Sequence, residues 1–276
     1  MTLLDKVVRA MERIAPLALA ESAWDNVGVL LEAPLPRPGA TRVFLTNDLT
    51  APVLAEAQAD PAVGVIVAYH PFLFSSFKRI TLDNPKQAIA LRCAAAGISV
   101  YSPHTALDSC MNGVNDWLAS GLGTGAVSVI KPRADVIEGQ EGAGLGRVMS
   151  LDTPVSLQTL VGRVKEHLKL EHVRLAKAPR HTTEPIRTIA ICAGSGNSVV
   201  SSVDADVYLT GEMGHHEALA ALERQTSVIL CEHSNTERGY LHSELAVRLQ
   251  QTLREQGMEE ASVVCSQVDR DPLQIV

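Results

Sequence analysis

Short aliphatic runs alternate along this chain with segments of helical character, and no other feature constrains the fold as strongly. The run VGVIVAY (63–69) has the composition of a buried strand, and PKQAIALRCAAAG (85–97) is helical and ends at Gly97. Such alternation is typical of layered α/β proteins with a largely parallel sheet. Aromatic residues make up only 4% of the chain against 46% hydrophobic residues. We therefore expect an aliphatic core and not an aromatic-rich β-sandwich.

The same reading along all 276 residues predicts the secondary structure and the domains. The expected strands are 42–47, 63–69, 98–102, 147–151, 172–176, 186–192, 205–211 and 227–233. The expected helices are 2–15, a short one over 51–60, 85–97, 156–170, 215–224 and 236–256. Residues 121–147 are rich in glycine and typical of a linker or a sheet edge. We predict an α/β fold of two related layered halves, with helices on mostly parallel sheets and a small central α/β domain. The predicted domains are 1–128 plus 206–276 and, between them, 129–205.

Charge and cysteine content narrow the function classes. Lysine and arginine number 24 against 31 aspartate and glutamate, a formal net charge of −7, which disfavours nucleic acid as a partner. No apolar run reaches the length of a membrane span, and the amphipathic N-terminus lacks the apolar core of a secretory signal. We expect a cytoplasmic protein, with a mitochondrial location left open despite the absence of a clear transit peptide. The five cysteines are scattered without a CxxC pair, so we expect buried free thiols.

Residues suited to metal binding follow directly after predicted strands. Four segments share this layout: VGVIVAYHP, ISVYSPHTALD, DVYLTGEMGHHE and SVILCEHSNTE. Because the carboxyl ends of parallel strands meet at one edge of a sheet, we expect their polar residues to share one cleft between the two halves. These residues are His70, His104, Asp108, Glu212, His215, His216, His233 and Glu237.

The residue types in this set predict a metal site. Histidine and carboxylate without cysteine suit Zn, Mn, Fe, Co or Ni, and two carboxylates can bridge two ions. Asp108 follows His104 by four residues, about one helical turn, and Glu237 follows His233 at the same spacing. We therefore expect a metal site in the larger predicted domain, with carboxylates that could bridge a second ion.

Five of these residues also have a purely structural interpretation. Ser234 and Glu237 have the spacing of a capping box ahead of the last predicted helix. The other structural alternatives are a surface position for His215 or His216, a turn cap for Asp108 and a loop position for His104. A separate segment, CAGSGNS (192–198), follows a strand but lacks both the GxGxxG pattern and the P-loop lysine. We interpret that segment as a tight turn between a strand and a helix.

Five segments carry a resemblance to a known family: AWDNVGVLLE (23–32), YHPFLFSSFKRIT (69–81), YSPHTALDSCMNGVNDWLA (101–119), GEMGHHEAL (211–219) and CEHSNTERGYL (231–241). The chain resembles the Nif-three-like family of NGG-interacting factors, which also carries the description GTP cyclohydrolase I type 2. The resemblance implies a two-domain α/β protein that assembles as a toroidal hexamer, a trimer of dimers, with a dinuclear metal site facing an interior cavity. Carried over position by position, it implies the metal ligands His70, Asp108, His233 and Glu237, with His104 beside the metals.

One position departs from the pattern of many bacterial members, which have two adjacent histidines before the proline. This chain has Tyr69-His70 there, as eukaryotic-type members do. A phenol is mostly protonated near neutral pH and is a poorer ligand than imidazole. The resemblance therefore implies a second metal that is bound more weakly or that recruits His104 or solvent.

The site and the resemblance together lead us to expect a metal-dependent hydrolase with two divalent ions, acting on a nucleotide-like or other small polar substrate. Asp108 and Glu237 are the candidates for bridging the ions. The candidates for moving protons are His104, Glu212 and His215. Two alternatives stay open: a non-catalytic carrier of iron or another metal, and a regulatory or interaction scaffold in which the metal is structural. We also expect a homo-oligomer, in the form of the hexamer.

Overall fold

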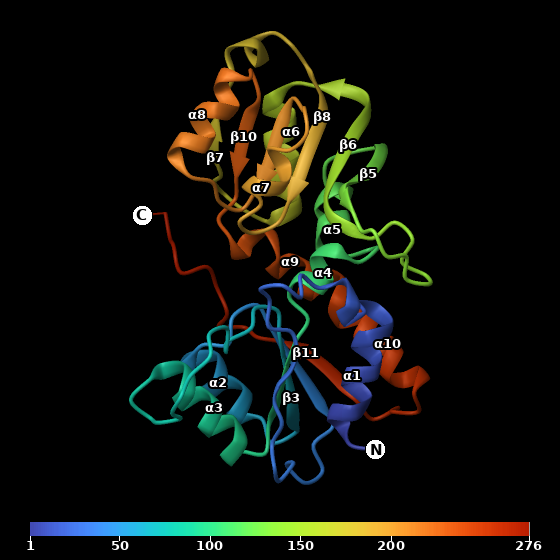
Figure 1. Ribbon diagram of the computed structural model, residues 1–276, viewed down its shortest axis with the longest axis vertical. Helices are drawn as coiled ribbons and strands as arrows, with labels where there is room; N and C mark the ends of the chain where they lie inside the picture. The colour runs from blue at the N-terminus through green and yellow to red at the C-terminus, as the bar shows by residue number, and fades with distance from the viewer. Residues whose placement is uncertain (276) are drawn as a thin grey trace. The chain divides into compact units, whose positions relative to one another are not determined.

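The computed structural model describes residues 1–275, and these divide into two compact units (Figure 1). Unit 1 comprises Met1–Leu107 and Tyr240–Arg270, and unit 2 comprises Asp108–Gly239 and the residues after Arg270. Each unit has its own sheet and helices, which confirms the α/β class. The units differ from the predicted domains, 1–128 plus 206–276 and 129–205. The reason is that strands on both sides of residue 206 pair within one sheet.

The sheet of unit 1 has five strands in the order β1-β4-β3-β2-β11. These are β1 (Gly28–Leu31), β2 (Arg42–Thr46), β3 (Val63–Ala68), β4 (Ser99–Ser102) and β11 (Ser262–Cys265). All pairings are parallel except that of β1 with β4. In register, Ile66 of β3 lies between Phe44 of β2 and Val100 of β4. Every residue of β3 is buried, as expected for a central strand covered on both faces.

Helices cover both faces of this sheet, with α2 and α3 on one side and α1 and α10 on the other (Figure 1). Their bounds are α1 (Leu3–Ile14), α2 (Ala51–Ala59), α3 (Pro85–Ala95) and α10 (Ala246–Glu255). The predicted end of α3 at Gly97 is confirmed. Gly97 has a φ of +70°, and the amide of Ile98 donates to the carbonyl of Cys93 at 3.0 Å, which closes a Schellman motif.

The helix predicted over 236–256 is divided into several pieces. A 3₁₀ turn, Ser234–Thr236, precedes α9 (Arg238–Tyr240), and a π-helical turn, Leu241–Leu245, leads into α10. Single π turns within helices are frequent near functional sites. The boundary between the two units also falls here, between Gly239 and Tyr240.

The sheet of unit 2 has six strands in the order β5-β6-β8-β9-β10-β7. They are β5 (Gly125–Pro132), β6 (Gly144–Val155), β7 (Arg174–Ala176), β8 (Ile186–Cys192), β9 (Val207–Thr210) and β10 (Ser227–Leu230). Only β8, β9 and β10 are parallel to one another, so this sheet is mixed, whereas mostly parallel sheets were predicted. The segment 129–205 forms no separate domain, since β6 pairs directly with β8.

The helices of unit 2 are α5 (Val114–Ser120), α6 (Leu157–Leu168), α7 (Asn197–Val200) and α8 (His215–Glu223). The helix α4 (Thr105–Ser109) contains the boundary between the units. The predicted free thiols are confirmed, with Cys265 half-buried and the other four cysteines buried. Across the described residues, no helix has the length and apolar character needed to cross a membrane.

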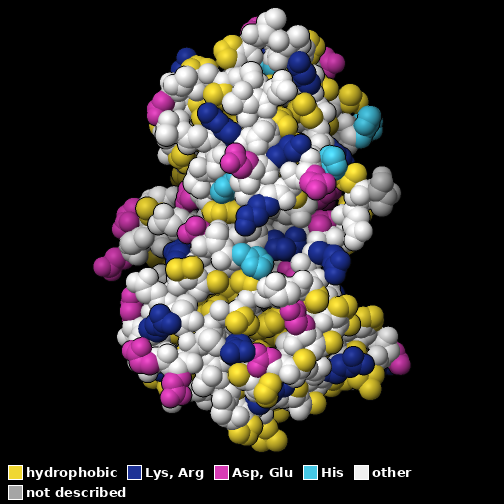
Figure 2. Space-filling model, turned by 180° about the vertical axis from the view of Figure 1, so that it is seen from behind, with side chains coloured by type: hydrophobic (Ala, Val, Ile, Leu, Met, Phe, Trp, Pro, Cys, Tyr) yellow, Lys and Arg dark blue, Asp and Glu magenta, His cyan; other side chains and the backbone are white. Residues whose placement is uncertain are grey.

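The surface of unit 1 combines charged and hydrophobic side chains. On the face drawn in the lower part of Figure 2, acidic and basic side chains are interspersed with hydrophobic ones. Several large hydrophobic side chains of this unit are exposed, among them Trp24 (55%), Phe74 (51%), Ile80 (55%) and Leu82 (68%).

Candidate metal centre

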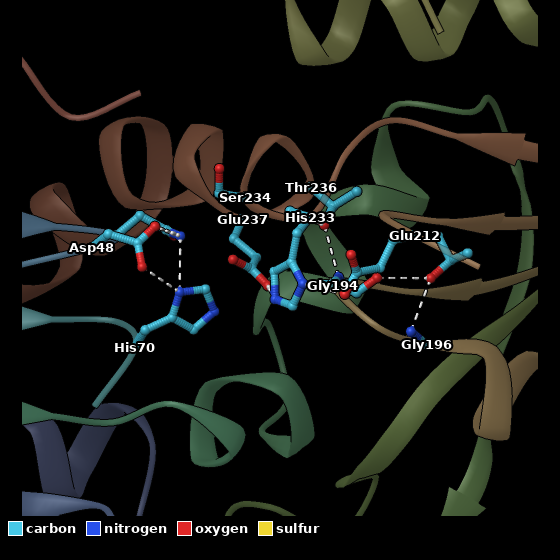
Figure 3. A network of polar contacts seen from close by, with 12 residues as sticks. Asp48, His70, Gly194, Gly196, Glu212, His233, Ser234, Thr236 and Glu237 are labelled. Atoms are coloured by element: carbon cyan, nitrogen blue, oxygen red, sulfur yellow. Dashed lines mark hydrogen bonds and ion pairs between the residues drawn. The ribbon is translucent and has the colours of Figure 1, made fainter. Parts of the chain in front are cut away.

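In unit 1, His70 lies just beyond the carboxyl end of the central strand β3. Its backbone amide donates to the carbonyl of Asn47 at 3.0 Å, which fixes the turn after the strand. Its Nδ1 lies 3.0 Å from Oδ1 of Asp48, a residue that follows the neighbouring parallel strand β2 (Figure 3). With Nδ1 donating to a carboxylate, the neutral ring presents Nε2 as its acceptor or metal-ligand nitrogen.

The second histidine of unit 1, His104, follows β4 and uses the same arrangement. Its Nδ1 lies 2.6 Å from Oδ1 of Asp25, whose side chain is fully buried. Burial alone would raise the pKa of Asp25, but hydrogen bonds from His104 and Thr105 outweigh it and hold the pKa below its usual value. Asp25 is therefore a carboxylate at neutral pH, and it accepts a hydrogen bond from the imidazole of His104.

Tyr69 packs against both of these histidine rings. Its side chain is 1% exposed, and its ring lies edge-on to His70, with centroids 5.1 Å apart, and to His104, with centroids 5.9 Å apart. The two histidine rings are themselves 5.4 Å apart between centroids. The three rings thus pack against one another in a triangle, with Tyr69 in contact with both imidazoles.

In unit 2, His233 stands between two carboxylates. Its Nδ1 lies 2.9 Å from Oε1 of Glu212, and its Nε2 lies 3.4 Å from Oε1 of Glu237 (Figure 3). The Glu237 side chain is 2% exposed, whereas those of His233 and Glu212 are 38% and 48% exposed. Glu212 follows β9 and His233 follows β10, so two neighbouring parallel strands deliver this pair as the sequence predicted.

The loop after β8 holds this group together through Gly194. The Gly194 amide donates to Oγ1 of Thr236 at 2.8 Å, and its carbonyl accepts from the amides of Gly211 and Glu212, both at 3.0 Å. Gly194 has a φ of +60°, and a Cβ there would lie 2.8 Å from Oε1 of Glu237 and 2.9 Å from Nε2 of His233. The turn predicted for CAGSGNS therefore needs glycine at position 194, because a side chain there would collide with Glu237 and His233.

Asp108 is anchored to the same loop by Asn115. The side-chain amide of Asn115 donates to the carbonyl of Asp108 at 3.0 Å, and its oxygen accepts from the amide of Ala193 at 2.9 Å. Burial, and after it the negative charges of Asp108 and Glu237, raise the pKa of the Cys192 thiol. Both carboxylates therefore lie near Cys192, at the end of β8, and unit 2 brings Asp108, His233 and Glu237 to one edge of its sheet.

The structure excludes the capping box that the sequence offered as an alternative role for Glu237. The hydroxyl of Ser234 donates to Asp271 at 2.7 Å and accepts from Arg238 at 2.8 Å, while the Glu237 amide donates to the Ser234 carbonyl at 3.2 Å. Ser234 and Glu237 therefore form no capping box, and the buried carboxylate of Glu237 is directed toward His233.

Two other candidates, His215 and His216, are exposed at the start of α8. Their rings lie 5.3 Å apart between centroids, and neither ring hydrogen-bonds to any residue in the described part of the chain. His215 is therefore not brought into hydrogen-bond contact with Glu212 or His233.

Three of the candidate histidines share one arrangement, in which Nδ1 contacts a carboxylate. The pairs are Asp48–His70, Asp25–His104 and Glu212–His233. Metal-binding histidines commonly have this arrangement, because the carboxylate fixes the tautomer and raises the basicity of the other nitrogen. Asp25 and Asp48 were not predicted as functional residues. Asp48 directly follows the predicted strand 42–47, and Asp25 lies inside the motif AWDNVGVLLE (23–32), so both positions carried a recognisable pattern.

A cavity of 480 Å³ in unit 2 borders Glu212. Its other polar lining includes Ser195, Asn197, Glu217 and Arg174, and the last of these is paired with Glu232 at 2.8 Å. The cavity is large enough for a small polar molecule and offers it mainly hydroxyl, amide and carboxylate groups.

Comparisons with known proteins show the family of this chain and agree with its fold. The family described as Duf34/NIF3 (NGG1p interacting factor 3) matches residues 2–272. The protein NIF3 homolog of Schizosaccharomyces pombe is 46% identical over 270 residues, covering 97% of this chain and 96% of that protein. The NGG1-interacting factor 3 of Saccharomyces cerevisiae is 39% identical over 286 residues, covering 99% and 96% of the two chains. In fold, the chain is similar to a hypothetical protein of Staphylococcus aureus, with a TM-score of 0.83 at 24% identity and 99% of both chains covered. The chain belongs to the Duf34/NIF3 family.

Proposed function

We propose that the protein binds two divalent metal ions and uses them as a metal-dependent hydrolase acting on a nucleotide-like or other small polar substrate. In this proposal the ligands are His70 from unit 1 and Asp108, His233 and Glu237 from unit 2. The observation that carries the proposal is that His70 and His233 each have Nδ1 held by a carboxylate. That arrangement prepares Nε2 as a ligand nitrogen.

The environment of Glu237 also fits a cation. A carboxylate that is 2% exposed needs a compensating charge or several hydrogen-bond donors, because burial of an isolated charge is costly. The imidazole of His233 lies 3.4 Å from this carboxylate. The two groups would both serve as ligands of a divalent ion, and Gly194 places no side chain beside them. Imidazole with carboxylate suits Zn, Mn, Fe, Co or Ni.

The residues around the ligands have separate tasks in the proposed reaction. When bound, divalent ions would lower the pKa of a water molecule and polarise the bond under attack, and Asp108 and Glu237 would be the carboxylates that hold them. Asp48 and Glu212 orient His70 and His233, so Glu212 serves as an orienting group and not as a proton carrier. The cavity beside Glu212 would hold the substrate.

Proton transfer in this proposal falls to His104. Its side chain is 15% exposed, and its Nδ1 is occupied by Asp25, so Nε2 is the nitrogen that exchanges a proton with the substrate or with water. His215, exposed on α8, is the remaining candidate for this role.

A metal carrier is the second candidate function, and the exposure of His233 favours it. With 38% of this side chain exposed, an acceptor molecule would have access to a metal bound there. A buried, enclosed centre would hinder such transfer.

One experiment separates the two functions. The protein is purified without an affinity tag, its metal content is measured, and a panel of phosphoesters, nucleotides and cyclic amides is screened for hydrolysis. Turnover that disappears in Glu237→Gln and persists in the exposed-surface control His172→Ala supports the hydrolase. Release of metal to a chelating acceptor without turnover of any substrate supports the carrier and contradicts the hydrolase.

The proposal also covers the oligomeric state of the protein and its location in the cell. We propose a homo-hexamer in the cytoplasm, and the exposed hydrophobic side chains of unit 1, such as Phe74 and Leu82, support an assembled state.

A further inference from the structure

His104 has a backbone conformation that non-glycine residues rarely adopt. Its φ is +34°, in a turn between Pro103 and the first residue of α4. Such a conformation is strained and persists only where the surroundings fix it. Here the His104 amide donates to the carbonyl of Tyr69 at 3.2 Å, and its carbonyl accepts from the amide of Leu107 at 2.9 Å. The strain places the imidazole against Asp25.

The Asp25 carboxylate is held in place by donors on both of its oxygens. Oδ1 accepts from the amide of Asn26 at 2.8 Å and contacts Nδ1 of His104 at 2.6 Å. Oδ2 accepts from the amide of Thr105 at 3.3 Å and from its hydroxyl. The Thr105 hydroxyl in turn accepts from the amide of Glu21 at 3.0 Å. The direction of the carboxylate is therefore set by four contacts, and it has no freedom to turn away from His104.

The other side of the imidazole lies among aromatic rings. Trp24 meets the His104 ring edge-on, with centroids 6.1 Å apart, and His70 does so at 5.4 Å. Within the described residues, Nε2 of His104 makes no hydrogen bond, while the side chain keeps 15% exposure. The ring thus has Nδ1 engaged by Asp25, while Nε2 makes no hydrogen bond within the described residues.

We propose that Asp25 is a positioning residue that holds His104 as the tautomer protonated at Nδ1, so that its unprotonated Nε2 is ready to accept a proton. The functional consequence rests on the proposed hydrolase, but the tautomer itself is a property of the protein without metal or substrate. Asp25 acts only through His104 and touches no reacting atom. The strain at His104 and the full set of donors around Asp25 are the two observations that carry this role.

The tautomer can be measured directly. The full-length protein, labelled with ¹⁵N-histidine and freed of metal, is studied by long-range ¹H–¹⁵N correlation above pH 8, where imidazoles with an ordinary pKa near 6.5 are neutral. The signals of His104 among the nine histidines are assigned with the variant His104→Gln. We expect a protonated Nδ1 and an unprotonated Nε2. A wild-type His104 protonated at Nε2, or an even mixture, would overturn the proposal without any variant.

The variant Asp25→Asn tests whether Asp25 determines the tautomer of His104. Thr105 donates twice to Oδ2, so the amide oxygen should stay there and the amide NH₂ should face Nδ1 of His104. We expect the tautomer to shift toward protonation at Nε2. The matched control Asp48→Asn makes the same change beside His70 and should leave the tautomer of His104 unaltered. An unshifted His104 in folded Asp25→Asn contradicts the proposal.

A functional measurement separates a positioning role from a purely structural one. For any substrate found to be hydrolysed, Asp25→Asn should lower kcat about 10–100-fold, the range typical of residues that orient a catalytic or ligating histidine. In the background of His104→Ala it should cause no further loss. Equal losses in both backgrounds would show that Asp25 merely supports the fold. Failure of the hydrolase proposal would appear as absent turnover in the wild type and would leave the tautomer result standing.

Discussion

Oε1 of Glu237 lies 3.4 Å from Nε2 of His233, although only 2% of the Glu237 side chain is exposed. The two residues are one helical turn apart, but no regular helix joins them, since a 3₁₀ turn over Ser234–Thr236 separates them. This turn, fastened by the contact of Thr236 with Gly194, directs the carboxylate toward the imidazole. The pair is therefore built by the loop contacts and not by helical periodicity alone.

Replacing the acid tests whether this pair serves a metal. We expect Glu237→Ala to remain folded and to lose bound metal, because it removes a buried ligand oxygen. A capping residue would instead cost about 0.5–2 kcal/mol of unfolding free energy and leave the metal content unchanged. Denaturant unfolding and elemental analysis of the same preparation distinguish these outcomes. Full metal stoichiometry in Glu237→Ala would return the residue to a structural role.

Gly194→Ala should disturb both ligands with a single methyl group. The added Cβ would lie 2.8 Å from Oε1 of Glu237 and 2.9 Å from Nε2 of His233, so at least one of them has to move. We expect weaker metal binding, together with a loss of about 1–2 kcal/mol from the left-handed backbone.

The matched control is Gly139→Ala, at φ +75° with no atom within 4 Å of the added Cβ. It should show the backbone cost and normal metal affinity in a metal titration. If both variants bind metal equally well, Gly194 has no part in shaping the site.

Tyr69→His tests the asymmetry expected of the two metals. Titration of the metal-free protein with Zn or Mn should show two separable steps, because a protonated phenol contributes little as a ligand. The weaker step should be lost first as the pH falls and the imidazoles become protonated. Restoring an imidazole should strengthen the weak step selectively, whereas Tyr69→Phe, which keeps the buried ring, should not. Two indistinguishable steps that neither substitution changes would place Tyr69 outside the coordination sphere.

The buried position of His181 predicts that the folded protein loses stability in mild acid. Burial, with the neighbouring Arg180 charge second, lowers the pKa of this histidine, and its Nδ1 lies 2.7 Å from Oγ of Ser227. Because the folded-state pKa is below the unfolded value near 6.5, this contribution to stability is complete above pH 6.5 and declines as the pH falls below it. Urea unfolding of the metal-free protein at pH 8 and pH 5.5 should show a smaller decline for His181→Gln than for the wild type. An identical decline in the two proteins would contradict this assignment.

Light scattering tests the proposed assembly. We expect the mass of a hexamer at micromolar concentration, since the apolar side chains exposed on unit 1 favour association. A monomer throughout that range would refute the hexamer.

The strands that carry the site were predictable because they are buried on both faces. Val63–Ala68 is apolar at every position, and such a run is recognisable without any partner. By contrast β11, Ser262–Cys265, is half-buried at every position, and β5 is largely exposed, so neither has a strong pattern. Accordingly, β11 was not predicted from the sequence, and the region of β5 was interpreted as a linker or a sheet edge.

The candidate ligands were recognisable from their place after strands, but the residues that orient them were not. Asp25 is 79 residues from His104, and no periodicity connects two such positions. The sequence around Gly194 predicted only a turn. That a side chain at Gly194 would collide with Glu237 and His233 is visible only in the folded chain. These contacts are tertiary and follow from the packing of the loops at the sheet edge.

The proposal that both units supply ligands is tested most directly by the metal content of single variants. Untagged wild-type protein, His70→Ala from unit 1, His233→Ala from unit 2 and the surface control His172→Ala are equilibrated with Zn or Mn and analysed for metal per chain. The account predicts two ions in the wild type and in His172→Ala, and a loss of metal in both His70→Ala and His233→Ala. Full metal content in His70→Ala would contradict it, because unit 2 alone would then hold the metal.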